Sequence, residues 1–178
     1  MATKYMGEYY IPRFEKEVEL LFGYDYDETG WGEIETPPTE KEIKEYENAL
    51  KNFIENIDET VERIKEEAFE YYKTVKSPYG YGTDIEKEHS VTIDDKEKHF
   101  EYMKDLYSVQ ITKSNKEETI FIILSIDYEI DTEHKMDILL FNNEVIKVTE
   151  ADETYHWNME ELFKIISEDA KQKLKKKA

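Results

Sequence analysis

Acidic side chains and one histidine are concentrated in the segment DYEIDTEH, residues 127–134. The groups able to hold a metal ion are Asp127, Glu129, Asp131, Glu133 and His134. Successive side chains of an extended segment point to opposite faces, so the four carboxylates would share one face of a strand. Carboxylates gathered in this way bind a hard divalent cation or share protons. The segment is a candidate metal site, although a solvated turn at a strand end is the simpler interpretation and the one that we favour.

A second acidic segment, YDYDETGWGEIE, spans residues 24–35. Asp25 and Asp27 alternate ahead of a glycine, as at the start of an EF-hand calcium loop. Such a loop needs a bidentate Glu at its twelfth position, where this chain has Thr36. We therefore expect an acidic surface turn, in which Asp25, Asp27 and Trp31 could contact a partner.

Other chemistries find little support in the sequence. The chain has no Cys, which excludes thiolate nucleophiles, iron–sulfur clusters and cysteine-bound zinc. Its four histidines include no i, i+4 pair, and its serines lack the glycines of a nucleophile elbow. Gly80 and Gly82 are not followed by a phosphate-binding Lys. We expect a protein that is not an enzyme and that needs no cofactor.

The charge of the chain is strongly negative and unevenly distributed. The 178 residues carry a net charge of −19, yet the basic tail, residues 171–178, holds five lysines and no acid. Without those lysines the net charge falls to −24. Such a charge repels nucleic acid and anionic membranes and attracts basic proteins. The tail itself is interpreted as a complement to a helix dipole. With no long apolar run and no basic, apolar leader, we expect a cytoplasmic location.

Tyrosine is unusually frequent, with 14 residues in the chain. Tyr combines a large apolar area with a polar tip and is enriched at protein interfaces. Eight of them occur as near neighbours in the sequence, and half of these are expected to pack in the core. Tyr79 and Tyr81 differ because they lie in the turn-rich segment SPYGYGTD, residues 77–84, which we expect to be a loop. We predict that this pair contacts a partner.

The elements that must position these groups begin with β-structure. Alternating apolar residues and glycines over residues 8–36 predict an N-terminal β-hairpin. Thr39 and Glu42 form a capping box, and apolar residues then recur every three or four positions to about Lys73. This run is long for one helix, and Asn56 with Glu59 offers a second cap pair. We expect a central pair of packed helices, or one helix with a break near Ile57.

The second half of the chain predicts a short helix and an antiparallel β-meander. Asp94 or Asp95 could cap the helix, and strands follow at residues 106–112, 119–127, 136–141 and 145–149. Asn142 and Asn143 suit a type I′ turn between the last two strands. The apolar run 120–124 predicts a central strand covered on both faces. A capping box at Asn158 begins a C-terminal helix, so the fold class is α+β in a single domain, residues 1–178.

The order of several short motifs resembles a known family. They are the Gly–Trp–Gly turn, EEAFEYYK, DTEH, NNEVIKV and EADE. Over about residues 10–155 they are similar to a family of uncharacterised bacterial cytoplasmic domains, some of which are suspected immunity proteins of polymorphic toxin systems. Where the family would have Gly after its Glu–His pair, this chain has Lys135. The resemblance implies no activity and no catalytic residue.

These observations lead to one hypothesis and two alternatives. The leading hypothesis is a non-enzymatic acidic protein that binds and inhibits a basic protein such as a toxin or nuclease, without direct contact with nucleic acid or membrane. One alternative is a domain that binds a small ligand or a divalent metal through the segment 127–134. The other is a nucleic-acid mimic, which would need carboxylates spaced like phosphates along one face.

Overall fold

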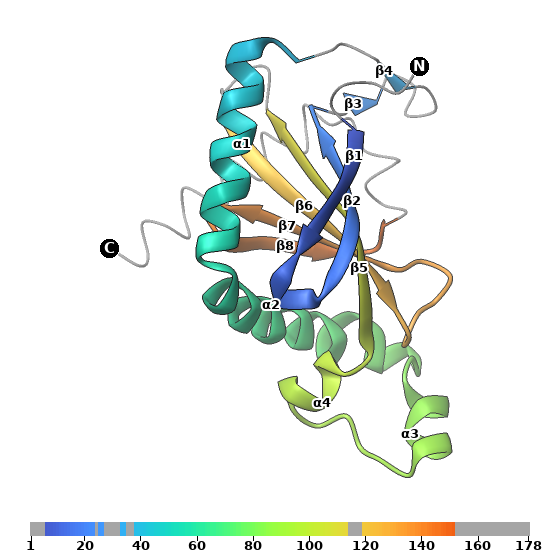
Figure 1. Ribbon diagram of the computed structural model, residues 1–178. Helices are drawn as coiled ribbons and strands as arrows, with labels where there is room; N and C mark the ends of the chain where they lie inside the picture. Colours follow the sequence, from blue (N-terminus) through green and yellow to red (C-terminus); the bar gives the residue numbers. More distant parts are fainter. Residues whose placement is uncertain (1–5, 24, 27–32, 35–37, 114–118, 152–178) are drawn as a thin grey trace.

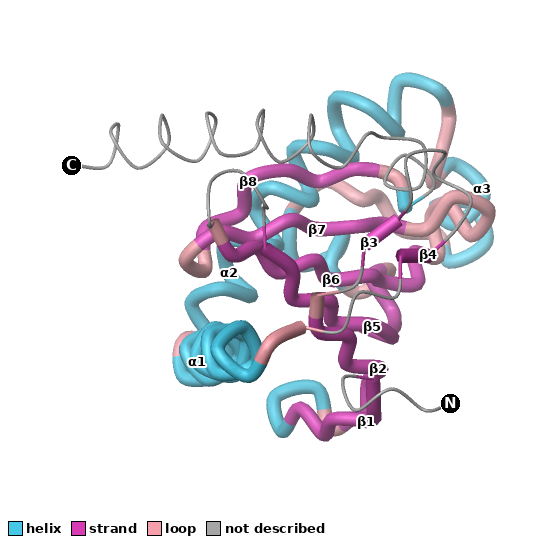
Figure 2. The backbone as a smooth tube through the Cα atoms, turned by 90° about the horizontal axis from the view of Figure 1, so that it is seen from above, coloured by secondary structure: helices cyan, strands magenta, loops and turns pink. Residues whose placement is uncertain are grey.

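The computed structural model describes residues 6–23, 25–26, 33–34, 38–113 and 119–151. Within them, six strands form a mixed sheet in the order β1-β2-β5-β6-β7-β8, and two short strands form a second sheet. The helices α1 and α2 lie along one face of the large sheet (Figures 1 and 2). The chain therefore has the expected α+β fold class.

The chain opens with two hairpins. The first joins β1 (Met6–Ile11) to β2 (Lys16–Phe22) through a 3-10 turn, and the second pairs β3 (Asp25–Tyr26) with β4 (Glu33–Ile34). Both pairs are antiparallel. The predicted N-terminal β-hairpin is confirmed.

A helix pair follows, and it breaks where the sequence indicated. Helix α1 (Glu40–Glu55) begins with the predicted capping box, in which Thr39 and Glu42 bond each other's backbone N–H. Helix α2 (Ile57–Tyr71) starts after a single intervening residue, Asn56. The predicted second cap pair is wrong. The Asn56 side chain donates backwards to the Asn52 carbonyl oxygen, and it caps no N–H of α2.

The C-terminal half of the large sheet is the predicted antiparallel meander. It consists of β5 (Met103–Lys113), β6 (Ile120–Tyr128), β7 (Met136–Phe141) and β8 (Glu144–Thr149). Asn142 and Asn143 both have positive φ, 46° and 62°, and they connect β7 to β8 as a two-residue turn. The pairing of β2 with β5 is parallel and was not predicted. It merges the N-terminal hairpin and the meander into one sheet.

The main core lies between this sheet and the two helices. Helix residues such as Phe53, Val61 and Ala68 pack there with strand residues such as Val109 and Ile138. On β6, residues 121–124 are all buried although they alternate between the two faces. This confirms the expected central strand. No helix in the described part of the chain has the length and apolar character needed to cross a membrane.

Short helical turns connect α2 to the meander and form the lower end of the molecule in Figure 1. A π-helical turn (Tyr72–Lys76) and a 3-10 turn (Ser77–Tyr79) lead into α3 (Thr83–His89), which the sequence did not predict. Helix α4 (Lys96–Phe100) is capped by Asp95, as expected, because the Asp95 carboxylate accepts from the Lys98 N–H at 2.9 Å. The predicted C-terminal helix and the basic tail lie outside the described residues.

Candidate functional site

A buried lysine is the centre of the first candidate site. Lys76 ends the π-helical turn after α2, and its side chain is only 1% exposed. The ammonium group donates to Asp131 Oδ2 at 2.5 Å and to Glu150 Oε1. It also lies 4.7 Å from the centre of the Tyr81 ring, within the range of a cation–π contact. One cation is thus enclosed by two carboxylates and an aromatic ring, and we call these four residues with His134 the inner site.

Asp131 is the most buried carboxylate of the inner site, at 4% exposure. Besides Lys76 it accepts hydrogen bonds from the backbone N–H of His134 at 3.2 Å and from His134 Nδ1 at 3.0 Å. Burial would raise the pKa of Asp131, but the hydrogen bonds from Lys76 and His134 outweigh it and lower the pKa. The hydrogen bond to Asp131 raises the pKa of His134 in turn. Burial would lower the pKa of Lys76, but its hydrogen bonds to Asp131 and Glu150 raise it, so the structure favours the charged forms of Lys76, Asp131 and His134.

The acidic segment 127–134 is not extended throughout, so its carboxylates do not form a row on one face of a strand. Strand β6 ends at Tyr128, and the chain then turns before β7. Asp127 pairs with Lys135 at 3.3 Å and Glu129 with Lys104 at 3.1 Å, whereas Glu133 is exposed and has no ion-pair partner in the described ranges. Asp127 and Glu129 are thus each paired with a lysine of their own.

Lys135 occupies a position that favours glycine. Its φ is +56°, in the left-handed region. The resemblance noted above would place Gly here, and the backbone explains that preference.

The inner site also holds the groups most able to bind a metal. One ligand atom from each of Asp131, His134 and Glu150 lies within 4.8 Å of the other two. The Lys76 ammonium, however, already contacts Asp131 and Glu150. A metal ion could bind these carboxylates only by displacing a buried cation that already neutralises them. The arrangement resembles a cation site in which the protein supplies the cation.

A layer of aromatic side chains lies beside the inner site. His99 Nε2 and the Tyr128 hydroxyl are 2.8 Å apart, and the His99 ring stacks on Tyr72 with centroids 5.1 Å apart. His99 is fully buried, and burial lowers its pKa to about 4. Burial likewise raises the pKa of Tyr128. This layer holds its polar groups neutral, in contrast to the inner site.

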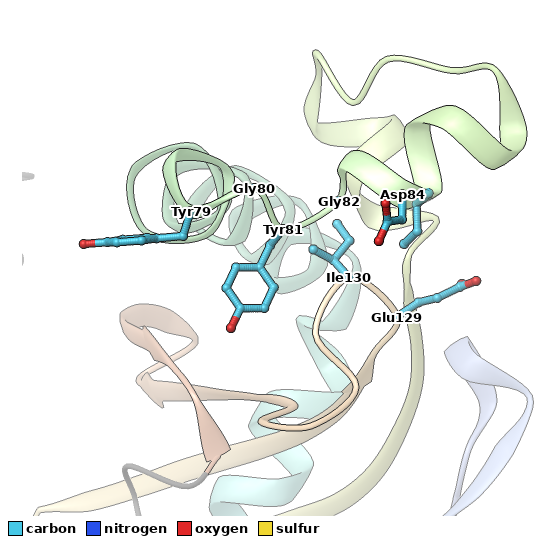
Figure 3. Close-up of a pocket in the computed structure, with 8 residues that line it drawn as sticks. Tyr79, Gly80, Tyr81, Gly82, Asp84, Glu129 and Ile130 are labelled. Atoms are coloured by element: carbon cyan, nitrogen blue, oxygen red, sulfur yellow. The ribbon is translucent and has the colours of Figure 1, made fainter.

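The second candidate site is a pocket of about 350 Å³ at the surface. It lies between the segment 79–85 and the turn that follows β6, and its lining includes Asp84, Ile85, Glu129 and Ile130 (Figure 3). The Tyr79 ring extends outward from the loop and is 82% exposed, whereas Tyr81 turns toward the sheet. We call this cavity the outer pocket.

The carboxylates of the outer pocket differ in their pairing. Glu129 forms the ion pair with Lys104 described above. Asp84 is exposed, and no ion pair or hydrogen bond of its carboxylate occurs among the residues that the structure describes. The outer pocket thus combines aromatic, aliphatic and anionic groups. Among the described residues, a lysine pairs with Glu129 but no basic side chain pairs with Asp84.

The structure brings together some of the predicted residues and separates others. Tyr79, Tyr81 and Glu129 meet at the outer pocket, while Asp131 and His134 belong to the inner site. The side chains of Asp25, Asp27 and Trp31 lie outside the described residues. Lys76, Glu150 and Asp84 were not among the residues predicted from the sequence. Lys76 follows the expected end of the helix like any solvated lysine, so no local signal indicates its burial.

Comparison with known proteins places the chain in a family. A family model described as a domain of unknown function (DUF6985) matches residues 3–156, and the chain belongs to this family. No curated protein and no solved structure matches the chain. The expected membership in a family of uncharacterised domains is confirmed, and the description of the family assigns no activity.

Proposed function

We propose that this domain is a non-enzymatic acidic protein that binds a basic protein and blocks it, as an immunity protein blocks a toxin. The observation that supports the proposal best is the outer pocket, where the Asp84 carboxylate has no ion-pair partner among the described residues and the Tyr79 ring, 82% exposed, extends outward from the same segment (Figure 3). Exposed aromatic side chains are frequent anchors of protein interfaces. A segment that carries both an exposed aromatic ring and an exposed carboxylate is a surface suited to a basic partner.

The charge of the whole chain supports the same proposal. At −19 the chain attracts cationic proteins over roughly 8 Å at physiological ionic strength and speeds their encounter with it. The inner site uses its charges internally, since Lys76 and His134 already neutralise it. Recognition is therefore assigned to the outer pocket and to the exposed acids around it.

The proposal is tested by direct binding and inhibition assays. The purified chain is immobilised and exposed to purified basic proteins, including toxins and nucleases encoded beside its gene, at about 0.1 M and about 1 M salt. We expect one of them to bind at low salt, to dissociate at high salt and to lose activity in the complex. Binding that is absent or independent of salt across the panel would contradict the proposal.

A matched pair of variants shows whether the loop takes part. Tyr79→Ser removes the 82% exposed ring of the outer pocket, whereas Tyr10→Ser removes a 52% exposed ring on β1, outside the pocket lining. Loss of an interface anchor costs about 2 kcal/mol or more in binding, which is about thirtyfold in affinity. We expect this loss for Tyr79→Ser only. Equal effects of the two variants would exclude the loop as the contact surface.

A divalent-cation site is the second candidate function, because Asp131, His134 and Glu150 have ligand atoms within 4.8 Å. The measurement that separates the two functions is thermal unfolding with calcium, magnesium, manganese or zinc. A shift that Asp131→Asn abolishes would support metal binding. We expect no such shift, because Lys76 contacts two of the three ligands.

A further inference from the structure

We infer that the outer pocket binds the guanidinium group of an arginine side chain. The inference rests on the proposed function, since the arginine would belong to the basic partner. It adds the residues that make the contact and the chemical group that they recognise.

The inner site shows how this chain binds a cation. There Lys76 is held by the carboxylates of Asp131 and Glu150 and lies 4.7 Å from the Tyr81 ring. Tyr81 also lines the outer pocket. The same tyrosine therefore belongs to a completed cation site and to a cavity with carboxylates nearby.

The outer pocket has the components of such a site except the cation. Asp84 supplies a carboxylate with no ion-pair partner among the described residues, and Tyr81 supplies an aromatic ring, whereas the exposed Tyr79 ring is directed away from Asp84 (Figure 3). Glu129 adds negative charge at the edge, although its carboxylate points away from the cavity in Figure 3 and pairs with Lys104. A cation that enters here would gain an ion pair with Asp84 without breaking an existing one.

The lining favours arginine over lysine. Ile85 and Ile130 provide apolar surface, which suits the weakly hydrated, planar guanidinium better than the strongly hydrated ammonium. A guanidinium can also stack on a tyrosine ring while it donates two parallel hydrogen bonds to a carboxylate. The cavity, at about 350 Å³, is at the small end of ligand pockets and is suited to one side chain.

The test uses a small probe, so that it does not depend on finding the partner. Acetyl-arginine amide is titrated into the isotopically labelled full chain, and backbone amide shifts are followed by NMR. Acetyl-citrulline amide, a neutral analogue of nearly the same shape, is the ligand control. We expect saturable shifts confined to residues 79–85 and 129–130 with the arginine probe, and at least tenfold weaker binding of the citrulline probe.

Two variants locate the carboxylate that is responsible. Asp84→Asn should weaken binding of the arginine probe about tenfold or more, which is the effect of losing a charged hydrogen bond. Glu133→Gln is the matched control, because Glu133 is also exposed and unpaired among the described residues but does not line the pocket. It should leave binding unchanged, and both variants should keep the spectrum of the folded chain.

Three results would overturn the inference: no saturable shift, equal binding of the two probes, or equal weakening by both variants. Failure of the proposed function would look different. If the arginine probe binds at residues 79–85 but no basic protein binds the chain, the arginine site is supported and the proposed function is contradicted. If a basic protein binds and Asp84→Asn has no effect on it or on the probe, the function stands and the inference fails.

Discussion

The inner site and the outer pocket use the same kinds of groups, but only the inner site contains a cation. In the inner site, Lys76 is 1% exposed and is bound by two carboxylates. In the outer pocket, the Asp84 carboxylate faces solvent. Tyr81 contributes to both.

This difference indicates that the inner site stabilises the fold and that the outer pocket is the one suited to bind a partner. The inner site connects the end of α2 to the turn after β6 and to the residue that follows β8, because Lys76 bonds partners 55 and 74 residues away. Its charges are satisfied, so it has little to offer a ligand. In the part of the chain that the structure describes, the Asp84 carboxylate of the outer pocket links no two elements, and it is accessible to a cation from a partner. Breaking the inner site should thus change stability, and breaking the outer pocket should change binding.

The largest expected effect comes from Lys76→Met, which keeps the length of the side chain and removes its charge. Asp131, at 4% exposure, would lose its main counter-charge. Removing one partner of a buried ion pair costs about 3–5 kcal/mol in the free energy of unfolding. Urea unfolding at neutral pH measures this loss.

Two further variants serve as controls for this experiment. Lys73→Met removes an ion pair with Glu70 in which both side chains are at least 45% exposed, and it should cost less than about 1 kcal/mol. The double variant Lys76→Met with Asp131→Asn removes both charges and should recover part of the lost stability. If Lys76→Met cost no more than Lys73→Met, the inner site would have no structural role.

The local elements of the fold were predictable from the sequence, and the pairings between distant segments were not. The capping box of Thr39 and Glu42 and the turn at Asn142 and Asn143 depend on residues three or fewer positions apart, and both are confirmed. The parallel pairing of β2 with β5 joins segments separated by the whole helical region. The apolar pattern of neither strand indicates which other strand it pairs with.

In the candidate site, too, contacts between residues close in the sequence were predictable and contacts between distant residues were not. Asp131 and His134 were candidates because they belong to the acidic cluster of residues 127–134, and they do contact each other. Their role was misjudged, because the cation between the carboxylates comes from Lys76, 55 residues away. Asp84 was missed because one acid at the start of a short helix looks like any solvated side chain. Only the fold shows which acids already have partners.

The second expected effect separates the charged inner site from the neutral aromatic layer beside it. His99 has a pKa of about 4 in the folded chain, against about 6.5 when unfolded. The unfolded chain therefore binds an extra proton below pH 6.5, and stability falls as the pH drops from about 6.5 to about 4. The expected loss is about 3 kcal/mol. Urea unfolding across this range measures it.

Two histidine variants test that assignment. His99→Gln should remove this loss of stability between pH 6.5 and 4. His134 should act in the opposite direction, because its pKa is raised in the folded chain. Its contribution to the free energy of unfolding is complete below pH 6.5 and is lost as the pH rises through the pKa of the folded chain. His134→Gln should therefore reduce the loss of stability above pH 6.5 and leave the loss below pH 6.5 unchanged. If His99→Gln lost as much stability between pH 6.5 and 4 as the unmodified chain, groups other than His99 would be the cause of that loss.

The third expected effect concerns the segment between the two sites. Gly82 has φ of +88°, and a Cβ there would lie 2.8 Å from the Tyr72 hydroxyl oxygen. Gly80 has φ of +85° with open space around it. Both Gly→Ala changes incur backbone strain, but only Gly82→Ala should also displace Tyr72, at an additional cost of about 1–3 kcal/mol. Equal unfolding free energies for the two variants would mean that Tyr72 moves freely and that the segment does not constrain the aromatic layer.

The smallest expected effect is the stability change of Asp84→Asn, and it tests the comparison from the side of the outer pocket. Asp84 is exposed and unpaired within the described part of the chain, so its replacement should change the free energy of unfolding by no more than about 0.5 kcal/mol. Asp131→Asn removes the negative charge and one of the two acceptor oxygens, so that the hydrogen bonds from Lys76 and His134 cannot both be kept, and it should cost several times more. Urea unfolding of the two variants side by side measures the contrast. A cost above about 1 kcal/mol for Asp84→Asn would mean that this carboxylate already has a structural task, and it would then not be free to receive a cation from a partner.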